Sequence, residues 1–228
     1  MTLVALPILV GLGSWQMSRK AWKEGLIAQL EARARSAPVA LEDAVRRHAA
    51  GEEIEYLKVR AAGEFRHDQE RYLYSPGASG PGVHVYTPLH VPGERVVLVN
   101  RGFVPDALIE RANRAESLAS GTVTVTGVVR MPVAAGWFVP APDLKRGIFF
   151  HPDPEAMLGT SAAKALPFVI DADATPNPGG WPKGGVTNVK LPSRHLEYAL
   201  TWFGLAFALV VIFLVYARGR LIGAPDKV

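Results

Sequence analysis

The sequence predicts a membrane protein of the α+β class, in which a transmembrane helix near each end flanks a β-rich, barrel-like domain of antiparallel strands with short helices. Two charge-free segments, residues 1–18 and 198–216, predict the membrane helices. The segment between them has ordinary polarity and contains runs of Val, Tyr, Thr and Phe bounded by Gly and Pro, which predicts the domain. The expected boundaries are 1–18 for the first helix, 19–194 for the domain, 195–217 for the second helix and 218–228 for a tail.

The second apolar segment has the length and the ends of a membrane span. At about 1.5 Å rise per residue it crosses a hydrocarbon core of about 30 Å. Tyr198 and Trp202 stand near one end and Tyr216 near the other, as interfacial aromatic residues do. Pro192 and Ser193 supply a helix start, with Ser193 as the cap. The alternative is a buried core helix, although such long uninterrupted apolar runs are typical of spans.

The first apolar segment is shorter, and no Lys or Arg precedes Arg19. A signal peptide would begin with basic residues and end at a small-residue cleavage site. We therefore expect the sequence to begin inside a membrane helix whose basic lead lies upstream. Small residues at Gly11 and Ser14, and at Gly204 and Ala208, predict close packing of the two helices.

The middle segment alternates turn residues with strand patterns. Helical spacing of apolar residues predicts a helix over 19–35, and two more short helices are expected at 41–48 and 155–164. Residues 172–185 are rich in Pro and Gly and are expected to form an exposed arm. Strands are predicted at 56–65, 71–74, 83–91, 96–103, 122–131 and 168–171, with Pro88 expected to break the third.

Composition excludes several functions. The chain has no cysteine, which excludes disulfides, thiolate metal sites and thiol catalysis. Its net charge is only +4 and the middle segment is nearly balanced, so no nucleic-acid interface is expected. The chain lacks nucleophile-elbow, phosphate-loop and HExxH motifs. A membrane-anchored hydrolase is therefore disfavoured, and we expect a protein that is not an enzyme.

His195 is the residue that most suggests cofactor chemistry, because it lies at the boundary of the second helix. At helical spacing it shares a face with Tyr198 and Trp202, and Trp15 is expected at a similar depth on the first helix. A neutral imidazole there can ligate haem iron while the aromatic residues pack against the porphyrin. The alternative is an interfacial histidine within a belt of aromatic residues.

Each of two charged neighbours of His195 has two candidate roles. Arg194 can pair with a haem propionate or with a lipid phosphate. Glu197 can accept a hydrogen bond from a ligating imidazole or face water.

Several motifs, in order, resemble the Surfeit locus (Surf/Shy) family of cytochrome c oxidase assembly factors. The Asn-Arg-Gly and His-Leu-x-Tyr-Ala motifs are specific in combination, and the similarity extends from residue 11 to residue 205. The motifs are Gly13-Ser14-Trp15-Gln16 with Arg19, Trp22 and Lys23; Thr87-Pro88-Leu89; Val97-Leu98-Val99-Asn100-Arg101-Gly102-Phe103-Val104-Pro105; Pro167-Phe168; Gly180-Trp181-Pro182; and His195-Leu196-Glu197-Tyr198-Ala199-Leu200-Thr201-Trp202-Phe203.

The resemblance implies an orientation and a function. It implies two spans in the bacterial inner membrane, a periplasmic domain, and a tail in the cytoplasm. It implies maturation of subunit I of haem–copper oxidases, with haem a as the bound group and haem a synthase as a further partner. The family's proposed haem ligand maps onto His195. We expect Trp15, Tyr198 and Trp202 to pack the macrocycle and Arg194 to lie at the mouth of the pocket.

This chain departs from the family pattern at two places. Phe103 replaces the usual Trp, and Ser193-Arg194 replaces the usual Asn-Asn before the histidine. Asn100 and Arg101 are expected to follow a strand into a turn and to organise the domain, with Arg101 binding loop carbonyls. A second hypothesis is a cofactor-free scaffold that stabilises subunit I during assembly.

Overall fold

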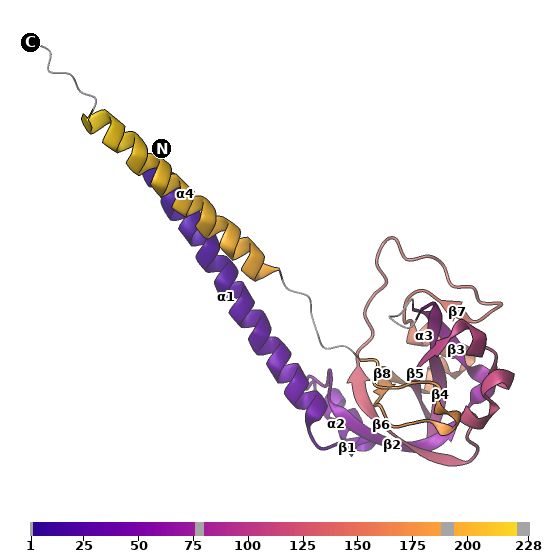
Figure 1. Ribbon diagram of the computed structural model, residues 1–228. Coiled ribbons are helices and arrows are strands. Elements are labelled where there is room, and N and C mark those ends of the chain that lie inside the picture. The colour runs from indigo at the N-terminus through magenta and orange to yellow at the C-terminus, as the bar shows by residue number, and fades with distance from the viewer. Residues whose placement is uncertain (1, 76–79, 188–193, 223–228) are drawn as a thin grey trace, which may run out of the picture. The chain divides into compact units, whose positions relative to one another are not determined.

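The computed structural model describes residues 2–75, 80–187 and 194–222. The chain divides into two compact units (Figure 1). We call the first the helix pair, which comprises residues 1–29 and 189–228. The second, the β unit, comprises Leu30–Asn188.

Two long helices supply the helix pair. The segments predicted as separate helices, 1–18 and 19–35, form the single helix α1, Thr2–Arg35. The second predicted span forms α4, His195–Ile222, of which His195–Arg220 is long and apolar enough to cross a membrane. Across the described residues this is the one helix that meets that criterion, so the first span stays a prediction. Ser193, the predicted cap, lies outside the described residues, as do positions 223–228 of the tail.

α1 and α4 pack against each other in antiparallel directions. His195 at the start of α4 meets Gln16, whereas Phe203 further along α4 meets Gly13 nearer the start of α1. A Cβ atom at Gly13 would lie 2.7 Å from the Phe203 ring, so the glycine makes room for the ring. The predicted pairing is confirmed, but the predicted small residues are wrong: Gly11 and Gly204 have no neighbouring atom within 4 Å of a built Cβ. The aromatic ring seated on a glycine replaces them.

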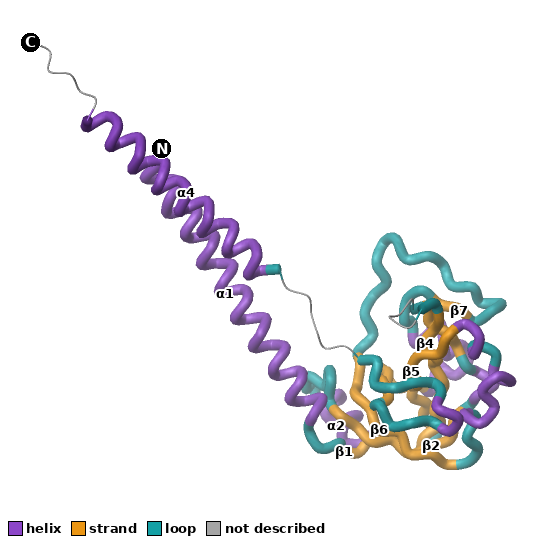
Figure 2. The backbone as a smooth tube through the Cα atoms, in the orientation of Figure 1, coloured by secondary structure: helices purple, strands orange, loops and turns teal. Residues whose placement is uncertain are grey.

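Five strands of the β unit close into a barrel. The strands are β2 (Lys58–Phe65), β6 (Thr122–Arg130), β8 (Ala165–Ala172), β5 (Arg95–Pro105) and β4 (Gly82–Val91), paired in that order. The barrel closes where Glu64 and Phe65 of β2 pair with His90 and Leu89 of β4. Figure 2 shows these strands in orange.

Four of the five barrel pairings are antiparallel, but β5 and β8 are parallel. The prediction of an antiparallel domain is therefore wrong at this pairing in the barrel, and also at two short parallel pairings outside it, 39–40 with β2 and 148–149 with 72–73. The connection between these strands contains the long segment 131–147 and the short helices, which gives the chain room to return in the same direction. Outside the barrel, β1 (Val39–Ala40) pairs with β2, β3 (Arg71–Tyr74) with β4, and β7 (Ile148–Phe149) with β3.

β4 and β5 are buried on both faces. Alternate side chains of β5 enter two different cores, one inside the barrel with Val97 and Val99 and one outside it with Val96 and Leu98. The outer core is completed by Phe149 of β7 and by Met157 of the short helix α3 (Pro154–Leu158). This explains why residues 96–99 form an unbroken apolar run instead of alternating with polar residues.

All six predicted strands are present, and Pro88 does not break β4. Pro88 pairs with Leu98 of β5, while its carbonyl accepts a hydrogen bond from the Arg66 N–H at 2.9 Å. In a strand the N and O of one residue point to the same side. The nitrogen of Pro88, which carries no hydrogen, therefore faces Arg66, and no hydrogen bond between β4 and β5 is lost. The two-residue strands β1 and β7 were not predicted.

The predicted short helices are present with one change. Residues 41–48 lie in α2, Leu41–Ala49. Residues 155–164 divide into α3, Pro154–Leu158, and the 3-10 segment η4, Gly159–Lys164, because Gly159 takes a φ of +54°. Other 3-10 turns are η1 (His67–Gln69), η2 (Asp106–Leu108), η3 (Arg111–Ser117) and η5 (Pro178–Gly180).

The predicted arm, 172–185, is attached to the barrel rather than free. Lys183 exchanges two backbone hydrogen bonds with Phe103 of β5, both at 2.9 Å. Gly185 donates to the Ala172 carbonyl at 2.9 Å. Eight of its fourteen residues are exposed, in line with the prediction, but its backbone is held by β5.

Candidate functional site

The predicted ligand His195 is held by a residue of the other helix. Its Nδ1 lies 2.8 Å from the amide oxygen of Gln16, which stands in the middle of α1. Ala199, one turn further along α4, is buried, so this edge of α4 faces α1. The site is therefore formed within the helix pair, with one residue from each helix.

The hydrogen bond to Gln16 determines which ring nitrogen is available to a metal. An amide oxygen only accepts, so the contact requires a proton on Nδ1 of His195. The neutral ring then carries its lone pair on Nε2. Iron-bound histidines commonly have this arrangement, because a hydrogen-bond acceptor on the second nitrogen fixes both the tautomer and the ring orientation. The donor set at His195 thus fits a haem iron.

The three predicted aromatic residues come from both helices, Trp15 from α1 and Tyr198 and Trp202 from α4. Trp202 lies two turns after His195, within about 20° of the same direction on α4, and is half-buried. Tyr198 and Trp15 leave 53% and 56% of their surfaces exposed. Trp15 precedes Gln16 and therefore lies at the depth of His195. The structure thus places Trp15 at the level of His195, with Tyr198 and Trp202 one and two turns further along α4, and leaves more than half of Tyr198 and Trp15 exposed.

Arg194 and Glu197 pair with each other. Arg194 Nε lies 3.3 Å from Glu197 Oε2, and both side chains are mostly exposed. Of the two roles considered for Glu197, hydrogen bonding to the imidazole is therefore wrong, since Gln16 fills that place. An exposed ion pair contributes little stability, so the guanidinium of Arg194 can readily exchange its partner for another anion.

The Asn-Arg-Gly motif forms a β-bulge within β5, not a turn after it. Tyr86 of β4 pairs with Asn100 and Val85 pairs with Gly102, so Arg101 is the extra residue. Gly102 has a φ of +118°, and a Cβ there would lie 1.9 Å from the Lys183 carbonyl oxygen, so only glycine fits. The bulge directs Arg101 away from the regular alternation of the strand.

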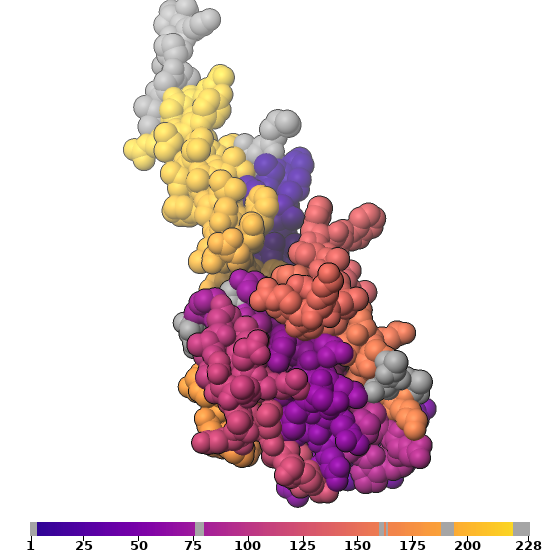
Figure 3. All heavy atoms as spheres, turned by 90° about the vertical axis from the view of Figure 1, so that its right-hand side faces the viewer, coloured from indigo at the N-terminus to yellow at the C-terminus, as the bar shows by residue number. Residues whose placement is uncertain are grey.

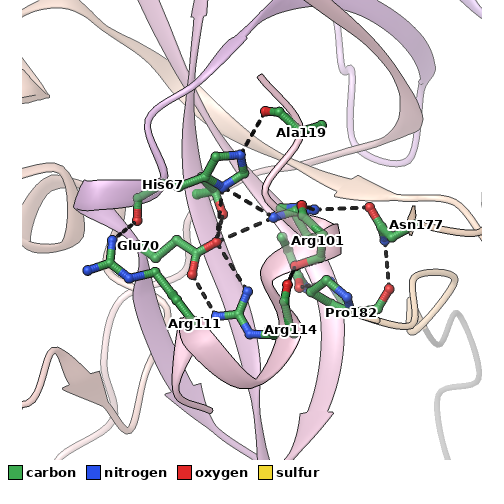
Figure 4. A network of polar contacts seen from close by, with 12 residues as sticks. His67, Glu70, Arg101, Arg111, Arg114, Ala119, Asn177 and Pro182 are labelled. Atoms are coloured by element: carbon green, nitrogen blue, oxygen red, sulfur yellow. Dashed lines mark hydrogen bonds and ion pairs between the residues drawn. The ribbon is translucent and has the colours of Figure 1, made fainter. Parts of the chain in front are cut away.

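Arg101 enters a buried cluster of charges centred on Glu70 (Figure 4). Glu70 Oε2 accepts a hydrogen bond from Arg114 Nη2 at 2.7 Å, and Oε1 lies 3.3 Å from Arg101 Nη1. Thr87 donates to the same oxygen at 3.2 Å, and His67 Nδ1 lies 3.3 Å from it. None of Glu70, Arg101 and Arg114 is more than 5% exposed. One carboxylate thus compensates two buried guanidinium groups.

The protonation of this cluster follows from its partners. Burial raises the pKa of Glu70, but His67 and Arg114, together with the charge of Arg101, lower it further, to about 2. Burial lowers the pKa of Arg101 to about 10 against the opposing effect of Glu70, which leaves it cationic at neutral pH. Glu70 and Arg101 are therefore both charged near pH 7.

The cluster ties loops to the barrel. Arg101 Nη2 donates to the Ser117 carbonyl at 2.7 Å and to Asn177 Oδ1 at 3.2 Å. Asn177 in turn donates to the Pro182 carbonyl at 2.6 Å. Asn100 donates to Asp171 at 3.0 Å and accepts from the Gly102 N–H at 3.1 Å. The predicted contact of Arg101 with loop carbonyls is confirmed.

With both clusters described, the sequence can be compared with known proteins. The sequence model of the SURF1 family matches residues 3–207, which include Gln16, the Asn-Arg-Gly bulge and His195. This chain belongs to the SURF1 family. The predicted family resemblance is therefore confirmed.

Several relatives of this SURF1-family chain support the assignment. A SURF1-like protein of Monosiga brevicollis is 39% identical and aligns with 96% of this chain and 87% of its own length. Surfeit locus protein 1 of Mus musculus is 35% identical, over 87% of this chain and 68% of the relative. The Homo sapiens protein of the same name is 34% identical, over 90% and 73%.

Gln16, Glu70 and Arg114 are the residues that sequence reasoning missed. A signal for Gln16 was present, because antiparallel packing of two helices joined through a domain places the end of the first apolar segment beside the start of the second. Glu70 carried no signal, since an isolated Glu between a turn and a short strand is most often exposed. Its burial depends on the tertiary approach of Arg101 and Arg114.

Proposed function

We propose that this SURF1-family chain assists assembly of haem–copper cytochrome c oxidase by holding haem a at the helix pair and presenting it to catalytic subunit I. The observation that carries the proposal is the His195–Gln16 hydrogen bond, which leaves Nε2 of His195 free for iron. Haem a is cargo here: a neutral imidazole supplies one axial bond, and its release delivers the group to the oxidase.

Several residues of the helix pair hold this cargo, each through a different interaction. Gln16 holds the imidazole in one tautomer and one orientation. Trp15, Tyr198 and Trp202 offer apolar faces to the macrocycle. Arg194 exchanges Glu197 for a propionate, to which it can donate two parallel hydrogen bonds. Because Tyr198 and Trp15 are open to the surroundings, cargo held here is accessible to a partner protein.

The proposed setting is the bacterial inner membrane. α4 crosses the bilayer, the first half of α1 forms a second span beside it, and the β unit lies in the periplasm. The proposed partners are subunit I, which receives the cargo, and haem a synthase, which supplies it. The buried cluster at Glu70 links loops of the β unit to the barrel and has no proposed role in holding the cargo.

The proposal is tested by complementation of a bacterial strain that lacks its own family member. Membranes are assayed for oxidase activity and for haem a in subunit I. The wild-type chain is expected to restore both, whereas His195→Ala restores neither. Leu196→Ala is the matched control, since this neighbouring side chain on α4 is exposed and holds no predicted role. Full restoration by His195→Ala would instead favour the cofactor-free scaffold.

A further inference from the structure

A long segment of the β unit presents apolar side chains to the outside. It comprises residues 131–147, between β6 and β7, and we call it the aromatic loop. Trp137 and Phe138 at its turn are 102% and 99% exposed. Val133 and Leu144 in the same segment are also exposed. Figure 3 shows this part of the chain, in salmon, standing out from the β unit.

The aromatic loop is held at its base. Asp143 and Ile148 exchange backbone hydrogen bonds at 2.8 and 3.0 Å, and His151 lies 2.6 Å from the Val133 carbonyl. A backbone hydrogen bond from Val139 to Gly136, at 3.2 Å, closes the turn that bears Trp137 and Phe138. The aromatic pair is thus displayed on a defined turn and covered by nothing within the β unit.

The aromatic loop carries a net positive charge. Its charged residues are Asp143, Lys145 and Arg146. The Asp143 carboxylate accepts the backbone N–H groups of Lys145 and Arg146, both at 3.1 Å. The two basic side chains are exposed. Exposed Trp and Phe on the same loop as exposed Lys and Arg form a combination that binds the headgroup region of an anionic bilayer.

The connection between the β unit and α4 is short. Six residues, 189–194, separate the end of the β unit from the start of α4, and seven Cα–Cα steps span at most about 25 Å. A β unit held this close to a membrane needs little further ordering for a surface loop to touch it. This reach rests on the proposed insertion of α4.

We infer that the aromatic loop is a second membrane contact, in which Trp137 and Phe138 enter the interface of the bilayer crossed by α4 while Lys145 and Arg146 face anionic lipid. Such a contact fixes the β unit at the membrane surface with two attachments instead of one. The surface is assigned to lipid rather than to a protein partner because its combination of exposed aromatic and basic side chains matches the chemistry of an anionic bilayer.

The absence of native cysteine allows a direct test with full-length protein. Phe138→Cys is labelled with an environment-sensitive fluorophore and reconstituted into phosphatidylcholine–phosphatidylglycerol vesicles that contain a lipid with a shallow spin-label quencher. Ser120→Cys is the matched control, since Ser120 is exposed near the opposite end of β6. Phe213→Cys reports insertion of α4 with a deep quencher.

The expected result is loss of fluorescence at position 138, none at position 120, and deep quenching at position 213. Lys145→Gln with Arg146→Gln is expected to reduce quenching at 138 in the anionic vesicles, with less change in phosphatidylcholine alone. An unquenched label at position 138 together with a quenched label at position 213 overturns the inference but leaves the span intact. The same conclusion holds if a protein partner protects position 138 in native membranes. An unquenched label at 213 overturns both the span and the inference.

Discussion

Replacing Glu70 by Gln is expected to lower the free energy of unfolding by about 3–5 kcal/mol, because two buried guanidinium groups lose their common carboxylate. Arg114 and Arg101 lie 2.7 and 3.3 Å from its oxygens, and neither can reach water to compensate. Gln keeps the shape of Glu but turns one acceptor oxygen into a donor, so the loss reports the charge together with the hydrogen bonds that this oxygen accepts. In a chain of this size the corresponding fall in melting temperature is about 10 °C. Thermal unfolding of the full-length protein in mild detergent measures it.

The matched control for this variant is Glu94→Gln. Glu94 pairs with Lys164 at 2.8 Å, but both side chains are largely exposed. The same chemical change there is expected to leave the melting temperature unchanged. Equal effects of the two variants would show that the buried cluster does not stabilise the β unit through its charge.

The contribution of Glu70 depends on pH in a defined direction. Its pKa falls from the ordinary 4.5 to about 2 on folding, so the folded state favours the ionised form. The resulting stability is present above about pH 4.5 and is lost as the pH falls through the folded pKa near 2. The difference in unfolding free energy between wild type and Glu70→Gln should therefore be constant at neutral pH and narrow below pH 4.5. A difference in unfolding free energy that stays constant down to pH 2 would contradict the lowered pKa of Glu70.

Replacing Gln16 by Leu is expected to weaken haem a binding by about 10–100-fold, the usual effect of removing the hydrogen-bond partner of a ligating histidine. Leu fills a similar volume without an acceptor, so the His195 ring loses its fixed tautomer and orientation. Titration of haem a into purified full-length protein, followed by its absorption spectrum, measures the affinity.

The Gln16→Glu variant distinguishes a role of Gln16 in positioning the His195 ring from a role in packing the two helices. The carboxylate still accepts the Nδ1 proton of His195, so binding is expected to recover to at least the wild-type level. A purely structural Gln16 would give equal affinities for the Leu variant and wild type. Helical content by circular dichroism should remain constant in all three proteins, because Gly13 and Phe203 continue to pack the helices.

The main elements of the fold were predictable from local patterns. The alternation of Val and Thr predicted β6, and the charge-free run predicted α4. The parallel pairing of β5 with β8 was not predictable, because strand direction depends on how the chain returns after a long connection. Whether β4 continues through Pro88 also depends on tertiary structure, because the proline nitrogen, which carries no hydrogen, must face a neighbour that needs no hydrogen bond from it.

The candidate site was predictable in part for the same reason. His195 and its aromatic neighbours follow from helical spacing along α4 and from the family motifs. Gln16 required knowledge of the antiparallel register between two helices that are distant in the sequence. The bulge at Arg101 required pairing with β4, since Asn-Arg-Gly alone equally predicts a turn.

The central claim, that His195 holds haem a, is tested most directly by an optical spectrum. Full-length protein is purified in mild detergent from cells that make haem a, beside the His195→Ala variant. The account predicts a reduced haem a spectrum in the wild type and its loss in the variant. Colourless wild-type protein on which oxidase assembly still depends would contradict the account and favour a cofactor-free scaffold.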